Sequence, residues 1–180
     1  MISTRALVHK RRILVVGSGG AGKSMLAIQL GRRLALPIVH LDALYWRPGW
    51  QPNPAAEWRD TGQRIVARDA WIIDGNYSGS LDLRLPVCDA VVFLDIPRSI
   101  CLCRVVKRRL KAYFRSGSEV APGCPTRLTW EFLRWVWQYP TVARARVQKP
   151  LESLPTGVEL IVVSSTAQVV QLCGDLRETA

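Results

Sequence analysis

A glycine-rich octapeptide near the start of the chain constrains the fold more than any other feature. Residues 17–24 read Gly-Ser-Gly-Gly-Ala-Gly-Lys-Ser, which matches the pattern G-x-x-x-x-G-K-[ST]. A β-branched apolar run at residues 13–16 precedes it, and apolar residues at helical spacing follow it. A buried strand, a glycine-rich turn and an amphipathic helix, in that order, are the setting in which this pattern cradles phosphates.

Each residue type in the octapeptide has an expected role. Glycines let backbone N–H groups point into a concavity that side chains would block. We expect Lys23 to contact the β and γ phosphates of ATP and Ser24 to offer its hydroxyl to Mg²⁺. The predicted ATP site consists of Gly17, Ser18, Gly19, Gly20, Ala21, Gly22, Lys23 and Ser24.

Strand and helix patterns alternate along the rest of the chain. Further strands are expected at residues 37–41, 71–75, 90–95 and 158–163, and helices at 22–35, 55–69, 98–114, 129–138 and 142–154. This alternation predicts an α/β protein, a three-layer α/β/α P-loop NTPase fold around a mainly parallel sheet of about five strands. At 180 residues without a convincing linker, we expect one domain, with a basic N-terminal extension at residues 1–11.

Composition and charge limit the classes of protein to which the chain can belong but do not identify its binding partner. The formal net charge is +11, so the surface should attract nucleotides, nucleic acid or acidic membrane surfaces. No DNA-reading motif appears, and no apolar run approaches the ~20 residues of a membrane span. Five cysteines without a CxxC pair suggest neither disulfides nor a zinc site. We expect a soluble cytoplasmic protein of unspecified oligomeric state, with nucleic acid as a partner that no motif supports.

Three carboxylates end predicted strands. Asp74 and Asp95 are alternatives for the acid that holds Mg²⁺. We favour Asp74, because the following Gly75 permits a sharp turn beside the phosphates, whereas a proline follows Asp95 after one residue. Asp42 follows the strand at 37–41, where open α/β sheets bind ligands, and is our candidate to orient or deprotonate an acceptor.

Basic residues crowd the predicted helix at 98–114. Arg104 and Arg108 are one turn apart and share a face, where a polyphosphate would relieve their repulsion. A solvated basic face and a nucleic-acid contact are the alternatives. Arg144 and Arg146 supply a second candidate pair for the transferring phosphoryl group, although two residues so spaced cannot both face inward on one helix.

Two further segments are candidates for substrate handling. The proline-rich loop at 45–54 carries Trp46 and Trp50, which could stack on an acceptor beside Asp42. Aromatic residues at 129–139 are expected mainly to pack in the core, with Pro140 ending their helix. Residues 110–128 contain serine, glycine and proline and are expected to form a lid that excludes water.

Several motifs together resemble the DNA topology modulation proteins, which are similar to adenylate kinase and related small P-loop kinases. They are residues 17–24, 40–50 (HLDALYWRPGW) and 71–77 (WIIDGNY), extended by 81–84, 93–98 and 131–140. The resemblance covers roughly residues 12–172. It implies a nucleoside monophosphate kinase-like fold and an ATP-dependent phosphotransferase, in which the expected lid would keep basal ATPase activity slow. It also supports the assignments of Asp74, Arg104 and Arg108.

One departure from adenylate kinases bears on the acceptor. There the acid-glycine turn continues with Phe-Pro-Arg, whose arginine binds the monophosphate, whereas this chain continues with Asn76-Tyr77-Ser78. Arg47, Arg59 and Arg84 are alternative replacements. The acceptor is therefore a nucleotide or another small hydroxyl compound, and its expected site comprises Asp42, Trp46, Arg47, Asp74, Gly75, Asn76, Tyr77 and Arg84. The alternative function is a nucleotide-binding protein associated with DNA that lacks small-molecule kinase activity.

Overall fold

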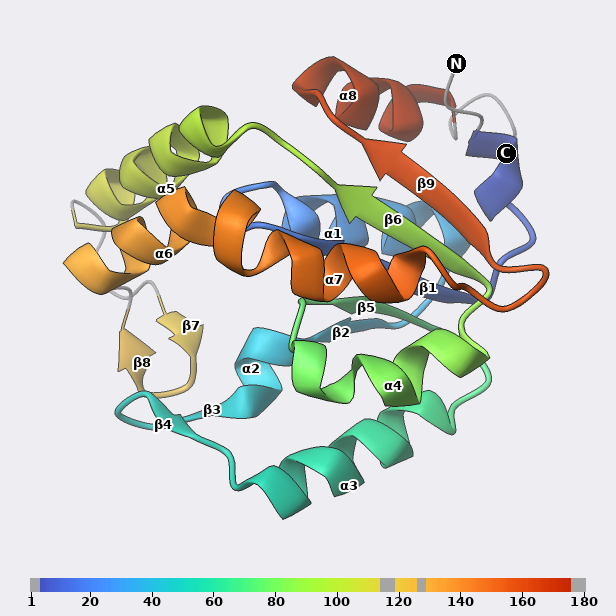
Figure 1. Cartoon of the computed structure of the whole chain (residues 1–180), viewed down its shortest axis with the longest axis horizontal. Helices are drawn as coiled ribbons and strands as arrows, with labels where there is room; N and C mark the ends of the chain where they lie inside the picture. Colours follow the sequence, from blue (N-terminus) through green and yellow to red (C-terminus); the bar gives the residue numbers. More distant parts are fainter. Residues whose placement is uncertain (1–3, 114–118, 126–128, 176–180) are drawn as a thin grey trace.

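A computed structural model describes residues 4–113, 119–125 and 129–175. Its centre is a parallel sheet of five strands in the order β2-β5-β1-β6-β9 (Figure 1). The strands are β1 (Arg12–Gly17), β2 (Ile38–His40), β5 (Trp71–Asp74), β6 (Ala90–Leu94) and β9 (Glu159–Val163). This confirms the predicted fold class.

Side chains alternate between the two faces of the sheet and build a core on each. Ile13 and Val15 of β1 belong to one core, and Leu14 and Val16 belong to the other. The first core is completed by α1 (Lys23–Leu34), α5 (Arg98–Tyr113), α6 (Trp130–Val142) and α8 (Thr166–Asp175). The second is completed by α2 (Leu41–Tyr45), α3 (Ala55–Val66), α4 (Leu81–Arg84) and α7 (Arg144–Leu151). Helices thus cover both faces, giving three layers (Figure 1).

Two small antiparallel hairpins lie outside the central sheet. One pairs β3 (Trp46–Arg47) with β4 (Gln51–Pro52), inside the segment expected to be a loop. The other pairs β7 (Glu119–Ala121) with β8 (Cys124–Pro125), inside the segment expected to be a lid. Residues 114–118 and 126–128 of that expected lid lie outside the described residues. The two hairpins are neighbours in space (Figure 1).

Two local expectations were wrong. Pro140 does not end its helix, because α6 continues to Val142 and the N–H of Ala143 still bonds to the carbonyl of Tyr139. A proline this near a C-terminus removes one intrahelical hydrogen bond without forcing the chain out of the helix. The described part of the expected N-terminal extension, residues 4–11, is not separate from the domain either, since Leu7 is fully buried against the first core. Within the described part of the chain, no helix is both long and apolar enough to cross a membrane.

Candidate active site

The phosphate loop follows β1 and has a backbone that only glycine accommodates. Gly17 has φ +147°, and a Cβ there would lie 2.5 Å from the carbonyl oxygen of Leu94. Gly20 has φ +82°, and its Cβ would lie 2.3 Å from the carbonyl oxygen of Cys101 on α5. The loop therefore lies against β6 at Gly17 and against α5 at Gly20, with no space for a side chain at either position.

The loop leads directly into α1, whose first turn faces a charged cluster. Gly22 is the N-cap and makes no side-chain cap, which leaves first-turn N–H groups available to an anion. The ammonium of Lys23 donates to the carbonyl of Ser18 at 3.0 Å. Burial lowers the pKa of Lys23, and the nearby Asp42 and Asp74 carboxylates partly oppose that shift. Lys23 thus lies between the loop and two acids, while Ser24 is exposed beside it.

Asp74 is positioned by the pairing of two neighbouring strands. The parallel register of β2 and β5 sets His40 opposite Asp74, and His40 Nδ1 lies 2.8 Å from Asp74 Oδ1. Asp74 is only 4% exposed. Sequence reasoning missed His40 as a partner, although both residues end parallel strands.

The residues after Asp74 connect the loop to the acceptor side. Asn76 Oδ1 accepts a hydrogen bond from the N–H of Gly17 at 2.8 Å, and its Nδ2 donates to Tyr139 Oη on α6 at 3.4 Å. Tyr77 Oη donates to Asp42 Oδ1 at 2.6 Å. Burial, followed by the charge of Asp42, raises the pKa of Tyr77, so its phenol stays a donor at neutral pH.

Arg84, which we expected in the acceptor site, has a different role. Its side chain is 2% exposed, and its guanidinium donates to the carbonyls of Gly75, Asn76, Tyr77 and Ser80. Burial lowers its pKa to about 10. Arg84 therefore holds the turn after β5 and has no free face for an acceptor.

The other two acceptor-arginine candidates form exposed ion pairs. Arg47 pairs with Glu57 of α3, and Arg59 pairs with Asp82 of α4 at 2.9 Å. All four side chains are about half exposed, so these pairs are accessible to water.

The arginines of α5 point in different directions: toward the phosphate loop, toward the solvent and into the interior. Arg104 donates to the carbonyl of Ala21 at 3.1 Å and to Thr166 Oγ1 at 2.7 Å. Arg108 is exposed, and its charge contributes to the lowered pKa of Lys23. Arg109 is 7% exposed, lies over the Phe132 ring, and has Nε and Nη1 without a hydrogen-bond partner. The sequence pattern gave no sign of this inward orientation.

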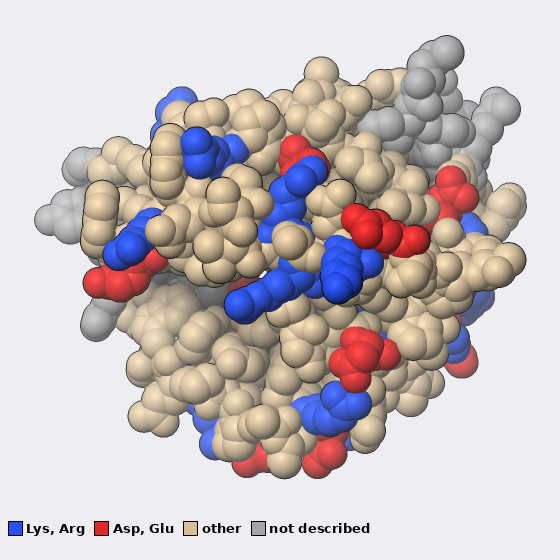
Figure 2. All heavy atoms as spheres, viewed as in Figure 1, with Lys and Arg blue, Asp and Glu red and all other residues tan. Residues whose placement is uncertain are grey.

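The arginines after Pro140 have different surroundings. Arg144 makes a two-point ion pair with Asp95, through Nε at 2.9 Å and Nη2 at 2.6 Å. Arg146 is exposed and, with Lys149, lines an open groove of about 690 Å³ that Ser78 and Gly79 also border. In Figure 2, basic side chains gather at the hollow in the centre of this face, below α6 and α7. The two arginines therefore do not converge on one point, as their spacing predicted.

The aromatic residues of α6 are also divided. Phe132 and Trp135 lie over Gly19, where a Cβ would come within 3.3 Å of both rings. Trp130 and Trp137 are exposed, and Arg98 lies 4.1 Å from the centre of the Trp137 ring. Core packing thus accounts for only some of the aromatic residues of α6.

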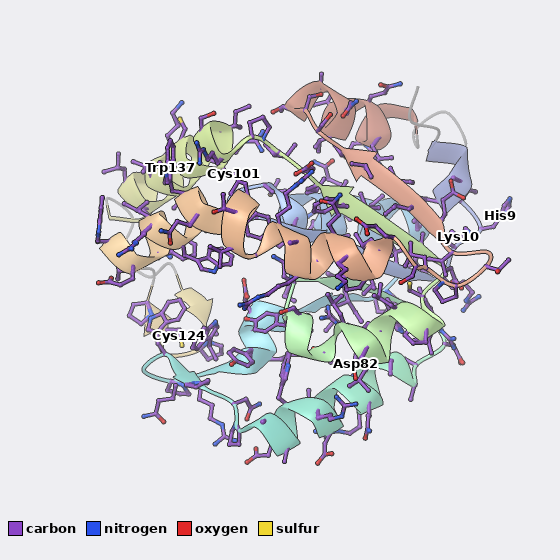
Figure 3. All side chains as sticks on the ribbon, in the orientation of Figure 1. His9, Lys10, Asp82, Cys101, Cys124 and Trp137 are labelled. Carbon is purple, nitrogen blue, oxygen red and sulfur yellow. The ribbon has the colours of Figure 1, made fainter. Side chains whose placement is uncertain are left out.

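The two hairpins contact each other directly. The N–H of Gly49 donates to the carbonyl of Gly123 at 3.0 Å, and Trp50 Nε1 donates to the carbonyl of Pro125 at 3.3 Å. Cys124 Sγ lies 3.1 Å from the carbonyl oxygen of Arg47, and Figure 3 shows Cys124 beside the β3–β4 hairpin. The lid segment and the acceptor segment are therefore joined in this structure.

Metal-ligand clusters of three or more His, Cys, Asp or Glu are absent from the part of the chain that the structure describes. All five cysteines are free thiols, and only Cys103 is exposed.

The fold is shared with solved small-molecule kinases. Shikimate kinase from Acinetobacter baumannii, in complex with shikimate, is 14% identical with a TM-score of 0.58 over 98% of this chain and 96% of that one. Shikimate kinase from Bacteroides thetaiotaomicron is 17% identical, with a TM-score of 0.54 over 94% and 98%. A sugar kinase from Janibacter sp. is 16% identical, with a TM-score of 0.52 over 94% and 95%.

These similarities show a P-loop kinase fold. No protein-family model and no curated protein matches the sequence. Membership of the DNA topology modulation proteins therefore stays a prediction from the motifs.

Proposed function

We propose that this protein transfers the γ-phosphoryl group of ATP to a small acceptor. One observation carries the proposal: Lys23 of the phosphate loop is within electrostatic range of both Asp42 and Asp74. Asp74 ends β5 and Asp42 lies just after β2, at the carboxyl edge of the sheet, where α/β proteins of this kind bind ligands. A donor site and an acidic acceptor site thus adjoin.

The donor side fits ATP and Mg²⁺. The loop has positive φ at Gly17, Gly20 and Gly22, conformations that favour glycine, and the first turn of α1 lacks a side-chain cap. Ser24 and Asp74 are the residues that would hold the ion, since both oxygens of Asp95 are paired with Arg144. When bound, Mg²⁺ would neutralise charge on the phosphates.

The acceptor side supplies a base. Asp42 Oδ1 accepts from Tyr77, which leaves Oδ2 to accept a proton from an acceptor hydroxyl. The hydroxyl oxygen forms a bond to the γ phosphorus while the bond to the bridging oxygen breaks, ADP leaves with that electron pair, and the proton passes to Asp42.

Basic residues act in two ways. Arg108 is exposed near Lys23 and would stabilise charge on the transferring group, with Arg146 as a second candidate. Arg104 bonds to the carbonyl of Ala21 and orients the loop. Arg144 would contact the transferring phosphoryl group only if its ion pair with Asp95 broke.

The joined hairpins would exclude water from the reaction, so hydrolysis of ATP without an acceptor should be slow.

We also propose that the chain forms one domain and works in a reducing cytoplasm, which is consistent with five free thiols.

No specific observation favours the DNA-associated alternative. Arg104 and Arg109 face inward, which removes two cations from the basic face of α5 on which that alternative depends. A steep dependence of DNA affinity on salt, together with base or shape preference, would support it.

The proposed function is tested with γ-labelled ATP and a panel of nucleosides, nucleotides and small alcohols. We expect label in one class of acceptor at a rate well above hydrolysis, and no transfer by Lys23→Ala. Equal ATP consumption with and without every acceptor would contradict the proposal.

A further inference from the structure

We propose that the acceptor is a hydroxyl compound with a flat face and no phosphate group. This inference rests on the proposed function and names the substrate class of the same site. It follows from an array of aromatic rings beside Asp42, from backbone strain within that array, and from the positions of the neighbouring arginines.

The array, here called the aromatic wall, consists of Tyr45, Trp46, Trp50, Trp58 and Tyr77. Adjacent ring centres are 4.6–5.5 Å apart, so each ring supports the next. Trp58 is buried and anchors the wall in the core, whereas the other four rings are half-buried. Tyr77 joins the wall to Asp42 by its hydroxyl. The exposed part of the wall therefore adjoins the carboxylate expected to receive the proton.

Two wall residues have a left-handed backbone conformation, in the turn between β3 and β4 and in the turn after β5. Trp50 has φ +65° and Tyr77 has φ +37°, and they are two of the three non-glycine residues with positive φ in the described chain. Such conformations are uncommon for residues other than glycine and concentrate at functional sites. These turns fix the directions in which the indole of Trp50 and the phenol of Tyr77 join the wall.

Within the described residues, the three candidate arginines of the acceptor side already have partners. Arg84 is buried on carbonyl oxygens, and Arg47 and Arg59 are paired with carboxylates. Asp42 is exposed on this side, and Asp74 lies nearby. A phosphorylated acceptor would therefore bring two negative charges toward these carboxylates, while the nearby ammonium of Lys23 is already engaged by the phosphates of ATP.

Arg146 and Lys149 are two further cations near the acceptor side. They line the groove beside Ser78 and Gly79, and none of the wall side chains borders that groove. A ligand stacked on the wall with a hydroxyl at Asp42 would leave the groove unused. Either a nucleobase or the C–H face of a sugar ring would provide the flat face.

Binding to the wall is measured separately from transfer. The protein saturated with MgADP is titrated with nucleosides, hexoses and the monophosphates of both, and tryptophan fluorescence is recorded. We expect an unphosphorylated compound to bind at least 10-fold more tightly than its monophosphate. Trp46→Ala should weaken that binding at least 10-fold and leave ADP affinity unchanged. Trp137→Ala is the matched control, because this exposed tryptophan lies on α6, away from the wall (Figure 3).

Each outcome decides one claim. Preference for nucleosides over hexoses identifies a nucleobase as the flat face, and the reverse identifies a sugar, and either supports the inference. Tighter binding of monophosphates, or failure of every unphosphorylated compound to bind, overturns it. Transfer to a monophosphate would overturn the inference and leave the proposed function intact. Binding at the wall without transfer to any compound would contradict the proposed function alone.

Discussion

The side-chain oxygen of Asn76 accepts a hydrogen bond from the backbone N–H of Gly17 at 2.8 Å. Asn76 follows β5, and Gly17 is the first residue of the phosphate loop, so one amide connects the acceptor side to the donor side. The same amide donates to Tyr139 of α6. The shape of the loop therefore depends on a residue 59 positions later in the chain.

We predict that Asn76→Ala weakens ATP binding and lowers the free energy of unfolding by about 1–3 kcal/mol, because the N–H of Gly17 loses its acceptor. Asn76→Asp keeps an acceptor oxygen and should preserve more of the stability, while its added charge still weakens ATP binding. Titration calorimetry and denaturant unfolding separate the two effects. Unchanged stability in Asn76→Ala would contradict this role.

Arg84 gives a prediction about stability. Arg84→Met removes donors from four carbonyl oxygens in a buried site, so we expect a loss of about 3 kcal/mol or more in unfolding free energy. Arg84→Lys should recover little, since an ammonium cannot reproduce the guanidinium fork. Arg59→Met is the control: its pair with Asp82 is exposed and should change stability by less than about 1 kcal/mol. Similar losses in the Arg84 and Arg59 variants would refute the assignment.

The sequence was sufficient where chemistry depends on local chain geometry. The strand, glycines and lysine of residues 13–24 predicted the loop, and strand ends predicted Asp42 and Asp74 at one edge. The sequence was insufficient for the arginines, because a pattern of positive charges does not show which way each side chain points. Arg84 turns back onto its own preceding turn, and Arg144 is directed to Asp95, 49 residues earlier. The pairing of His40 with Asp74 required the strand order, and the contact between hairpins required the tertiary fold.

The contact between the hairpins is tested at Gly123. This residue has φ +70°, and a Cβ there would lie 2.8 Å from Cβ of Pro48. We expect Gly123→Val to separate the hairpins and to raise the ratio of ATP hydrolysis to phosphoryl transfer several-fold. Gly157→Val is the control, since Gly157 has φ +91° but no atom within 4 Å of a built Cβ. An equal ratio in both variants would show that the hairpins do not exclude water.

Alkaline pH should weaken the fold through Cys88. Burial raises the pKa of this thiol from 9.0 to about 11. The unfolded chain then loses this proton first, so the contribution of Cys88 is complete below pH 9 and declines as pH rises to about 11. The difference in unfolding free energy between wild type and Cys88→Ala should fall by roughly 2 kcal/mol across that interval. A difference that is constant with pH would contradict the prediction.

The central claim is that Lys23 and Asp42 form the donor and acceptor halves of one phosphoryl-transfer site. The most direct test measures phosphorylated acceptor, inorganic phosphate and ATP affinity in wild type and Asp42→Asn, with an acceptor found by the panel. The amide keeps an oxygen for the Tyr77 hydroxyl and cannot take the proton. We predict that transfer falls by about 10²-fold or more, while ATP affinity and basal hydrolysis are retained. Normal transfer by Asp42→Asn, or a wild type that only hydrolyses ATP, would contradict the account.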